Sequence, residues 1–235
     1  MHKTEKSAYP DITKNDLPEI SLTALILGLV GGFFIANIYR FKFIGLPLNI
    51  IALCVFHFLE FYITAKYNPL QVTTNSYILR NGSEYTLATL ISICECLLNS
   101  YVFHIDNKIG FKLSCIMIVG GFMALVGQYF RSQAMITCGS SFNHTVQQEK
   151  QEDHVLITNG VYKVSRHPSY FGFFYWSIGC QLMCLNFVSF FLFTFILWNF
   201  FNRRITMEEE YLIKFFGQDY VKFRKSTGVG IPFIK

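Results

Sequence analysis

Charge is scarce in this sequence of 235 residues. Asp, Glu, Lys and Arg make up only 15% of it, whereas 52% of the residues are hydrophobic and 26 are Phe. A water-soluble domain usually carries about 25% charged residues. The apolar residues also gather in runs close to the length of a membrane-crossing helix, and the mean hydropathy is +0.35. The sequence is therefore not that of an ordinary soluble domain, and it predicts a protein with several membrane spans.

Several motifs of soluble chemistry are also missing. The seven Cys form no Cys-x-x-Cys pair, and the six His form no His-x-x-His or His-x-x-x-His pair, so neither a metal site nor a disulfide framework is expected. No Gly-rich phosphate loop of the Walker or dinucleotide type occurs. The net charge of +5 comes from basic residues scattered around the apolar runs rather than gathered in a stripe. No nucleic-acid partner is therefore expected.

Six apolar segments predict about six transmembrane helices in an all-α integral membrane protein. They cover residues 21–39, 46–65, 86–103, 113–136, 170–185 and 187–201. The last two are each barely long enough to cross a thinned bilayer and are separated by Asn186 alone, which favours a tight helical hairpin. The chain divides into a polar N-terminal tail at 1–20, four transmembrane helices at 21–136, and a region at 137–235. This last region holds a long polar loop, the hairpin and a C-terminal helix.

A few ionisable side chains lie within these apolar segments, where such groups are usually paired or functional. His57 and Glu60 are one turn apart on one helix face, and we interpret them as a buried polar contact between helices. Glu95 and Arg131, in the third and fourth segments, have opposite charges and could form a pair.

The polar segment at 137–166 is too long for a simple connection, and its recurring apolar positions indicate that it folds against the rest of the chain. Directly after it, Pro168 favours the first turn of a helix. The free N–H groups of that turn, with Arg166 and His167 beside them, favour an anionic guest. The plainer interpretation is an interfacial anchor, because Arg, His and Tyr are common at membrane boundaries.

Arg204 and Glu208 form a second polar group, four residues apart and therefore on one helix face. They lie just beyond the last apolar segment, so they mark the point where the chain leaves the membrane. A structural ion pair is the alternative, although Arg before Glu is the weaker order for stabilising a helix.

Short segments along nearly the whole chain form one recognisable set. The members are Arg166-His167-Pro168-Ser169-Tyr170-x-Gly172, Arg204-x-x-x-Glu208-Glu209, Tyr9-Pro10-Asp11-Ile12, Phe56-His57-Phe58-Leu59-Glu60, Gly139-Ser140-Ser141-Phe142-Asn143-His144, Gly160-Val161-Tyr162, Phe216-Gly217-x-x-Tyr220 and Gly230-Ile231-Pro232-Phe233-Ile234. The set resembles the isoprenylcysteine carboxyl methyltransferase family, and specifically its fungal forms. The Arg-His-Pro pattern alone is shared with phospholipid N-methyltransferases and sterol reductases, so the full-length match carries the resemblance.

The resemblance implies an enzyme that uses S-adenosylmethionine to methylate the free carboxylate of a C-terminal farnesyl- or geranylgeranyl-cysteine. Its substrates are CaaX proteins from which the last three residues have been removed, such as Ras-like GTPases and a lipidated mating pheromone. It resides in the endoplasmic reticulum membrane. The region at 137–235 is then the catalytic region, with its polar loop as a cytosolic cofactor-binding loop.

The resemblance also assigns roles to residues. Arg204 and Glu208 are catalytic, and Arg204 binds the substrate carboxylate. The cofactor lies against Gln147, His154, Val155, Leu156, Ile157, Tyr162, His167, Pro168, Ser169, Tyr170 and Glu208. A C-terminal carboxylate is already ionised at neutral pH, so no general base is needed, and Arg204 is expected to orient the carboxylate without protonating it.

Three other functions remain as alternatives. A phospholipid N-methyltransferase of the same membrane fold would bind an amine, and the basic Arg204 argues against it. A sterol reductase using NADPH would need contacts for a large dinucleotide. A non-enzymatic membrane adaptor would leave the dense polar set between Gln147 and Glu208 without a purpose.

The distribution of basic residues predicts the orientation. Most Lys and Arg flank the spans on the side of both termini and of the loop at 137–166, which places that side in the cytosol. Two glycosylation sequons, at Asn81 and Asn143, fall on the same side and should stay unmodified.

In the first span Gly28 and Gly32 have GxxxG spacing, which either seats a second copy of the chain or reflects a glycine-tolerant membrane helix.

Overall fold

The computed structural model describes residues 15–79, 82–106, 108–150 and 154–235, and this part of the chain contains helices and no strand. Its α-helices are α1 (Leu17–Ala36), α2 (Gly45–Tyr67), α3 (Ser83–Tyr101), α4 (Phe111–Cys138), α5 (Pro168–Met183), α6 (Phe187–Phe216) and α7 (Gln218–Ser226). Short 3-10 helices lie at Ile38–Arg40, Thr74–Tyr77, Gly139–Ser141 and Gly160–Lys163. The all-α prediction is confirmed, while most of the predicted N-terminal tail and the sequon at Asn81 lie outside the described residues.

Each of the six apolar segments forms a helix whose ends have local causes. α1 begins four residues before the predicted boundary, because Asp16 accepts a hydrogen bond of 3.1 Å from the backbone N–H of Glu19 and caps the helix. α5 begins at Pro168, as predicted. α6 runs unbroken over 30 residues and ends at Gly217, whose φ of 55° favours glycine. The helical pattern beyond residue 201 therefore continues α6, and α7 is a separate short helix.

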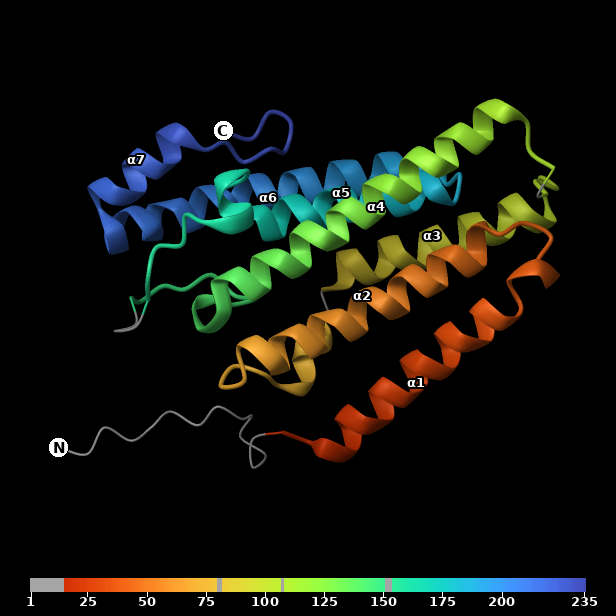
Figure 1. Ribbon diagram of the computed structural model, residues 1–235. Helices are drawn as coiled ribbons and strands as arrows, with labels where there is room; N and C mark the ends of the chain where they lie inside the picture. The colour runs from red at the N-terminus through yellow and green to blue at the C-terminus, as the bar shows by residue number, and fades with distance from the viewer. Residues whose placement is uncertain (1–14, 80–81, 107, 151–153) are drawn as a thin grey trace.

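By length and composition, three of the described helical segments could cross a membrane, namely Leu17–Ala36, Gly45–Tyr67 and Phe111–Ser141. α5 is shorter, with 16 residues. It is joined to α6 through residues 184–186, and the two helices pack along one another (Figure 1). α1 lies at the edge of the molecule beside α2 (Figure 1).

The backbones of α4 and α5 touch along paired glycines. Gly120 and Gly127 of α4 face Gly179 and Gly172 of α5, and a Cβ atom added to any of the four would collide with the backbone of the facing helix. Both helices repeat a glycine every seven residues, so the small positions meet twice along the contact. This close approach fixes the start of α5 against α4, and the start of α5 carries the Arg-His-Pro motif.

The opposite end of the molecule holds a polar network that corrects one prediction. Glu95 accepts hydrogen bonds from the backbone N–H groups of Val188 and Ser189 at 2.9 and 2.7 Å, and from the Ser189 hydroxyl at 2.6 Å. It thus caps the start of α6 and does not pair with Arg131. Opposite charge alone could not identify the partner of Glu95, because a sequence does not show which helix ends meet. Arg131 lies beside Arg204, near the other end of α6.

Candidate active site

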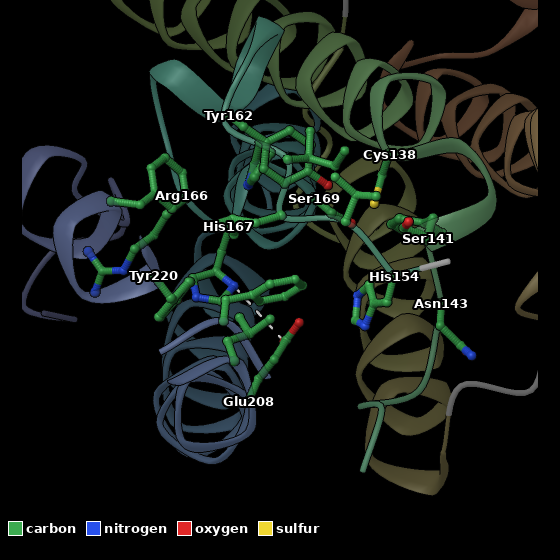
Figure 2. A pocket seen from close by; sticks show the side chains of 18 of the residues that line it. Cys138, Ser141, Asn143, His154, Tyr162, Arg166, His167, Ser169, Glu208 and Tyr220 are labelled. Carbon is green, nitrogen blue, oxygen red and sulfur yellow. Dashed lines mark ion pairs between the residues drawn. The ribbon is translucent and has the colours of Figure 1, made fainter. Parts of the chain in front are cut away.

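A cavity opens where the start of α5 meets the last turns of α6. Figure 2 shows its side chains converging from the polar loop on one side and from the helices on the other. Ten of the eleven residues expected at the cofactor line it: His154, Val155, Leu156, Ile157, Tyr162, His167, Pro168, Ser169, Tyr170 and Glu208. Gln147 is not among the lining residues. The sequence did not indicate the apolar wall that α6 and α7 add, which consists of Leu212, Phe216 and Phe223.

Tyr170 joins the two residues of the predicted catalytic pair. Its hydroxyl donates to Oε2 of Glu208 over 2.6 Å and accepts from Nε of Arg204 over 2.8 Å. The Tyr170 ring stacks between His167 and Phe201, with ring centroids 5.6 and 5.1 Å away. Arg204 and Glu208 therefore lie on one face of α6 as predicted, and a partly buried tyrosine from α5 contacts both of them.

A second cavity lies on the Arg204 side of Tyr170. Besides Arg204 and Tyr170 it is lined by Phe56, Asn75, Ile78, Arg131, Phe142, Asn143, His144, Thr145, Phe173, Phe200 and Phe201. The Arg204 guanidinium lies 5.3 Å from the Tyr170 ring centroid and donates from Nη2 to the backbone carbonyl of His144. The two cavities thus meet at Tyr170, with Glu208 facing one and Arg204 facing the other.

Comparison with known sequences gives this geometry its context. A sequence model of the isoprenylcysteine carboxyl methyltransferase (ICMT) family matches residues 118–214. Protein-S-isoprenylcysteine O-methyltransferase of Saccharomyces cerevisiae is 47% identical over 98% of this chain and 97% of its own length. The enzyme of the same name from Schizosaccharomyces pombe is 44% identical over 92% of this chain and 94% of its own length.

The chain belongs to the isoprenylcysteine carboxyl methyltransferase family.

A solved structure of this family has a similar fold. It is described as the eukaryotic intramembrane Ras methyltransferase ICMT, is 36% identical in sequence, and superimposes with a TM-score of 0.82. The match covers 92% of this chain and 77% of that one. The similarity therefore extends over the spans and the region at 137–235 together.

The sequence predicted an anionic group beside Arg166 and His167. In the structure the carboxylate of Glu209, from the same chain, occupies that position. Its Oε1 accepts from Nε of Arg166 over 2.5 Å and lies 3.2 Å from Nε2 of His167, while Nε of Arg224 lies 3.1 Å from its Oε2. Burial alone would raise the pKa of Glu209, but the hydrogen bonds from His167 and Arg166 outweigh it and hold that pKa below its usual range. No role was predicted for Glu209 from the sequence, where its only signal was that a second Glu follows Glu208 directly.

His167 lies between the two neighbouring carboxylates of α6. Its Nδ1 is 4.0 Å from Oε2 of Glu208, the pair marked by the dashed line in Figure 2, while its Nε2 faces Glu209. The Arg166 guanidinium also donates from Nη1 to the backbone carbonyl of Thr227 over 2.8 Å. These contacts fix the first turn of α5 against the C-terminal segment, and with it one wall of the cavity.

A buried ion pair lies at the second cavity, which one of its members lines. Arg131 of α4 donates from Nε and Nη2 to the two carboxylate oxygens of Glu60 of α2, each over 2.7 Å. It also donates from Nη1 to the Ser169 hydroxyl over 2.5 Å. The interhelical contact predicted for Glu60 is thereby confirmed, and the partner is Arg131. His57, predicted to share that contact, instead reaches the backbone carbonyl of Tyr77 at 2.8 Å.

The residues that line the first cavity suit a ligand with an anionic end. Pro168 and Ser169 at the start of α5 line the cavity, and the N-terminus of a helix favours an anionic group. Glu208 offers a carboxylate to an ammonium or to hydroxyl groups, and the apolar wall of Leu212, Phe216 and Phe223 offers a surface for a flat ring. S-adenosylmethionine combines these three features.

Proposed function

We propose that this protein transfers a methyl group from S-adenosylmethionine to the C-terminal carboxylate of a prenylated cysteine. The relatives that match it over nearly their full length carry the name protein-S-isoprenylcysteine O-methyltransferase. The observation that carries the proposal is the Tyr170 hydroxyl, bonded at once to Arg204 and Glu208 at the meeting point of two cavities. A methyl donor in one cavity and a carboxylate in the other would meet there.

The cofactor is assigned to the cavity of Glu208 and His167. When bound there, S-adenosylmethionine would supply the electrophilic methyl group. Glu208 would hold its ammonium or ribose hydroxyls, and the start of α5 at Pro168 would hold its carboxylate. The remaining predicted contacts from the polar loop, His154 to Ile157, would line the other side. Gln147 stays a predicted contact.

Arg204 is assigned to the substrate carboxylate. Its Nε and Nη2 are already committed to Tyr170 and to the His144 carbonyl, so the guanidinium plane is fixed before substrate binds. The carboxylate is ionised at neutral pH and needs no base. The transfer would convert a carboxylate anion and a sulfonium into a neutral ester and a neutral thioether, so a water-poor site would favour it. The aromatic lining of the second cavity, with Phe173, Phe200 and Phe201, supplies such surroundings.

The prenyl chain is assigned to the apolar space that leads away from Arg204. The second cavity shares Phe173 and Phe200 with a third cavity between α3 and α6. Phe200 is 45% exposed, so this space would be open toward the bilayer if α6 spans the membrane as proposed. A wholly apolar chain could therefore enter from lipid rather than from water.

For the whole chain we propose six spans, formed by α1 to α6 with α5 and α6 as a tight hairpin, in the endoplasmic reticulum membrane. The described helices that qualify as spans by length, the short link between α5 and α6, and the basic residues near the loop at 137–166 support this topology. Both termini, the loop at 137–166 and the active site are then cytosolic. Asn143 should stay unglycosylated, and a glycosidase-sensitive band shift at Asn143 would contradict the orientation.

The proposed substrates are processed CaaX proteins, such as Ras-like GTPases and a lipidated mating pheromone, delivered in the membrane.

We also propose that two copies associate through α1. A Cβ atom added at Gly28 or Gly32 would meet nothing within 4 Å, so these glycines are not needed for packing within the chain. Neighbouring Gly31, in contrast, faces Cys54 of α2 and belongs to the contact between α1 and α2.

One assay separates this proposal from the phospholipid N-methyltransferase alternative. The purified protein in lipid nanodiscs is given labelled S-adenosylmethionine with farnesyl-cysteine or with phosphatidylethanolamine. We expect label in farnesyl-cysteine as a base-labile ester and none in the lipid amine, because the Arg204 guanidinium would repel an ammonium group. Base-stable label in phosphatidylethanolamine would overturn the proposal.

A further inference from the structure

The third cavity is a mainly apolar chamber between the first turns of α3 and the middle of α6. Its lining is Gly82, Ser83, Glu84, Tyr85, Ala88, Phe173, Phe193, Ile196, Leu197 and Phe200. Most of these side chains are large, but Ala88 carries a single methyl group and is only 3% exposed. Ala88 therefore occupies a wall position where a larger side chain would fill the chamber.

The chamber continues the substrate path along one face of α6. Phe193, Leu197 and Phe200 precede Arg204 by eleven, seven and four residues, which is helix spacing for a single face. At 1.5 Å per residue, Leu197 and Phe193 lie roughly 10 and roughly 16 Å along the helix from Arg204. A prenyl chain whose carboxylate end is held at Arg204 would thus place its last isoprene units beside Leu197, Phe193 and Ala88.

We infer that Ala88 sets the length of prenyl chain that the enzyme accepts. This inference rests on the proposed function and adds its chain-length specificity. A geranylgeranyl chain is one isoprene unit longer than a farnesyl chain, and the space left by the Ala88 methyl group receives that last unit. The wild-type protein accordingly accepts both chains, and a larger residue at position 88 excludes the longer one.

The test is Ala88→Leu in the full-length protein, assayed with S-farnesyl-cysteine and S-geranylgeranyl-cysteine. Deleting or adding even one methylene in an apolar pocket changes kcat/KM by roughly 10-fold or more. We expect kcat/KM for geranylgeranyl-cysteine to fall at least about 10-fold, with farnesyl-cysteine changed less than about 3-fold. The farnesyl rate also reports that the variant is folded.

Two further variants make the test specific. Cys94→Leu adds similar volume at an exposed position of the same helix, and it should change neither substrate. Leu197→Ala, combined with Ala88→Leu, returns volume to the chamber from the facing helix and should restore much of the geranylgeranyl rate. Such a reciprocal rescue is not expected of a general folding defect.

The remaining outcomes would contradict either the role of Ala88 or the proposed function. Equal losses for both substrates, or no loss for either, would overturn the role of Ala88, because the end of the chain would then lie elsewhere. Failure of the wild-type protein to methylate any prenyl-cysteine would instead overturn the proposed function on which the inference rests.

Discussion

The Tyr170 hydroxyl lies 2.6 Å from Oε2 of Glu208, although one residue comes from the first turn of α5 and the other from the far end of α6. The same oxygen accepts from Arg204 over 2.8 Å. A single phenol therefore sets the distance between the group assigned to the cofactor and the group assigned to the substrate.

Tyr170→Phe should impair catalysis more than folding. The ring would keep its stacking on His167 and Phe201, but Arg204 and Glu208 would lose their common partner. Loss of orientation typically costs on the order of 100-fold in rate. We expect kcat to fall by about 10- to 100-fold with little change in thermal unfolding temperature. An unchanged kcat would show that the hydroxyl does not position the pair.

Glu209→Gln should lower stability in a pH-dependent way. The pKa of Glu209 lies below its unfolded value of about 4.3, so its contribution is fully present above that pH and is lost as the pH falls through the folded pKa. Removing one partner of a buried charge cluster costs about 3 kcal/mol. Thermal unfolding in detergent should show a large gap between wild type and variant at pH 7 that narrows toward pH 3. A gap that is constant with pH would contradict this assignment.

Gly127→Ala should destabilise the protein although Ala is the better helix former. The added methyl group would meet the backbone of Trp176 in α5, which cannot move aside as a side chain could. We expect a loss of about 2 kcal/mol or more, measured by chemical unfolding. Gly121→Ala is the matched control on the same helix, because its Cβ would meet only the flexible Met183 side chain at 3.8 Å. Equal stability of the two variants would exclude backbone contact as the reason for Gly127.

Gly28→Leu combined with Gly32→Leu should weaken self-association. Both positions face away from the rest of the chain, so the change should leave the fold and methyl transfer by the single copy intact. The measurement is the yield of crosslinked dimer in native membranes. An undiminished yield would mean that any contact between copies lies elsewhere.

Sequence could predict the helices and a set of residues that the structure brings together around the first cavity, but not the residues that support them. Apolar runs and Pro168 marked the helices because local chemistry decides where a helix starts. The pairings of Glu60 with Arg131 and of Glu95 with the start of α6 depend on which helix ends meet. Likewise, Glu209 follows Glu208 directly, and only the packing of α5 against α6 directs one side chain to Arg166 and the other to Tyr170.

In the proposed mechanism Arg204 holds the substrate carboxylate while Glu208 holds the cofactor. Arg204→Lys keeps the charge but loses the planar fork that contacts Tyr170 and the His144 carbonyl together. Glu208→Gln keeps the shape and removes the charge. Arg203→Lys and Glu210→Gln are the controls, since both side chains are exposed on other faces of α6.

The most direct measurement is methyl transfer to farnesyl-cysteine by equal amounts of folded protein, with the KM of each substrate determined separately. Arg204→Lys should lower kcat/KM for farnesyl-cysteine on the order of 100-fold, and Glu208→Gln should raise the KM for S-adenosylmethionine, while both controls stay near wild type. Near-normal turnover of farnesyl-cysteine by Arg204→Ala would contradict the assignment of Arg204 to the substrate carboxylate. Arg204 and Glu208 would then have only a structural role, as hydrogen-bond partners of Tyr170.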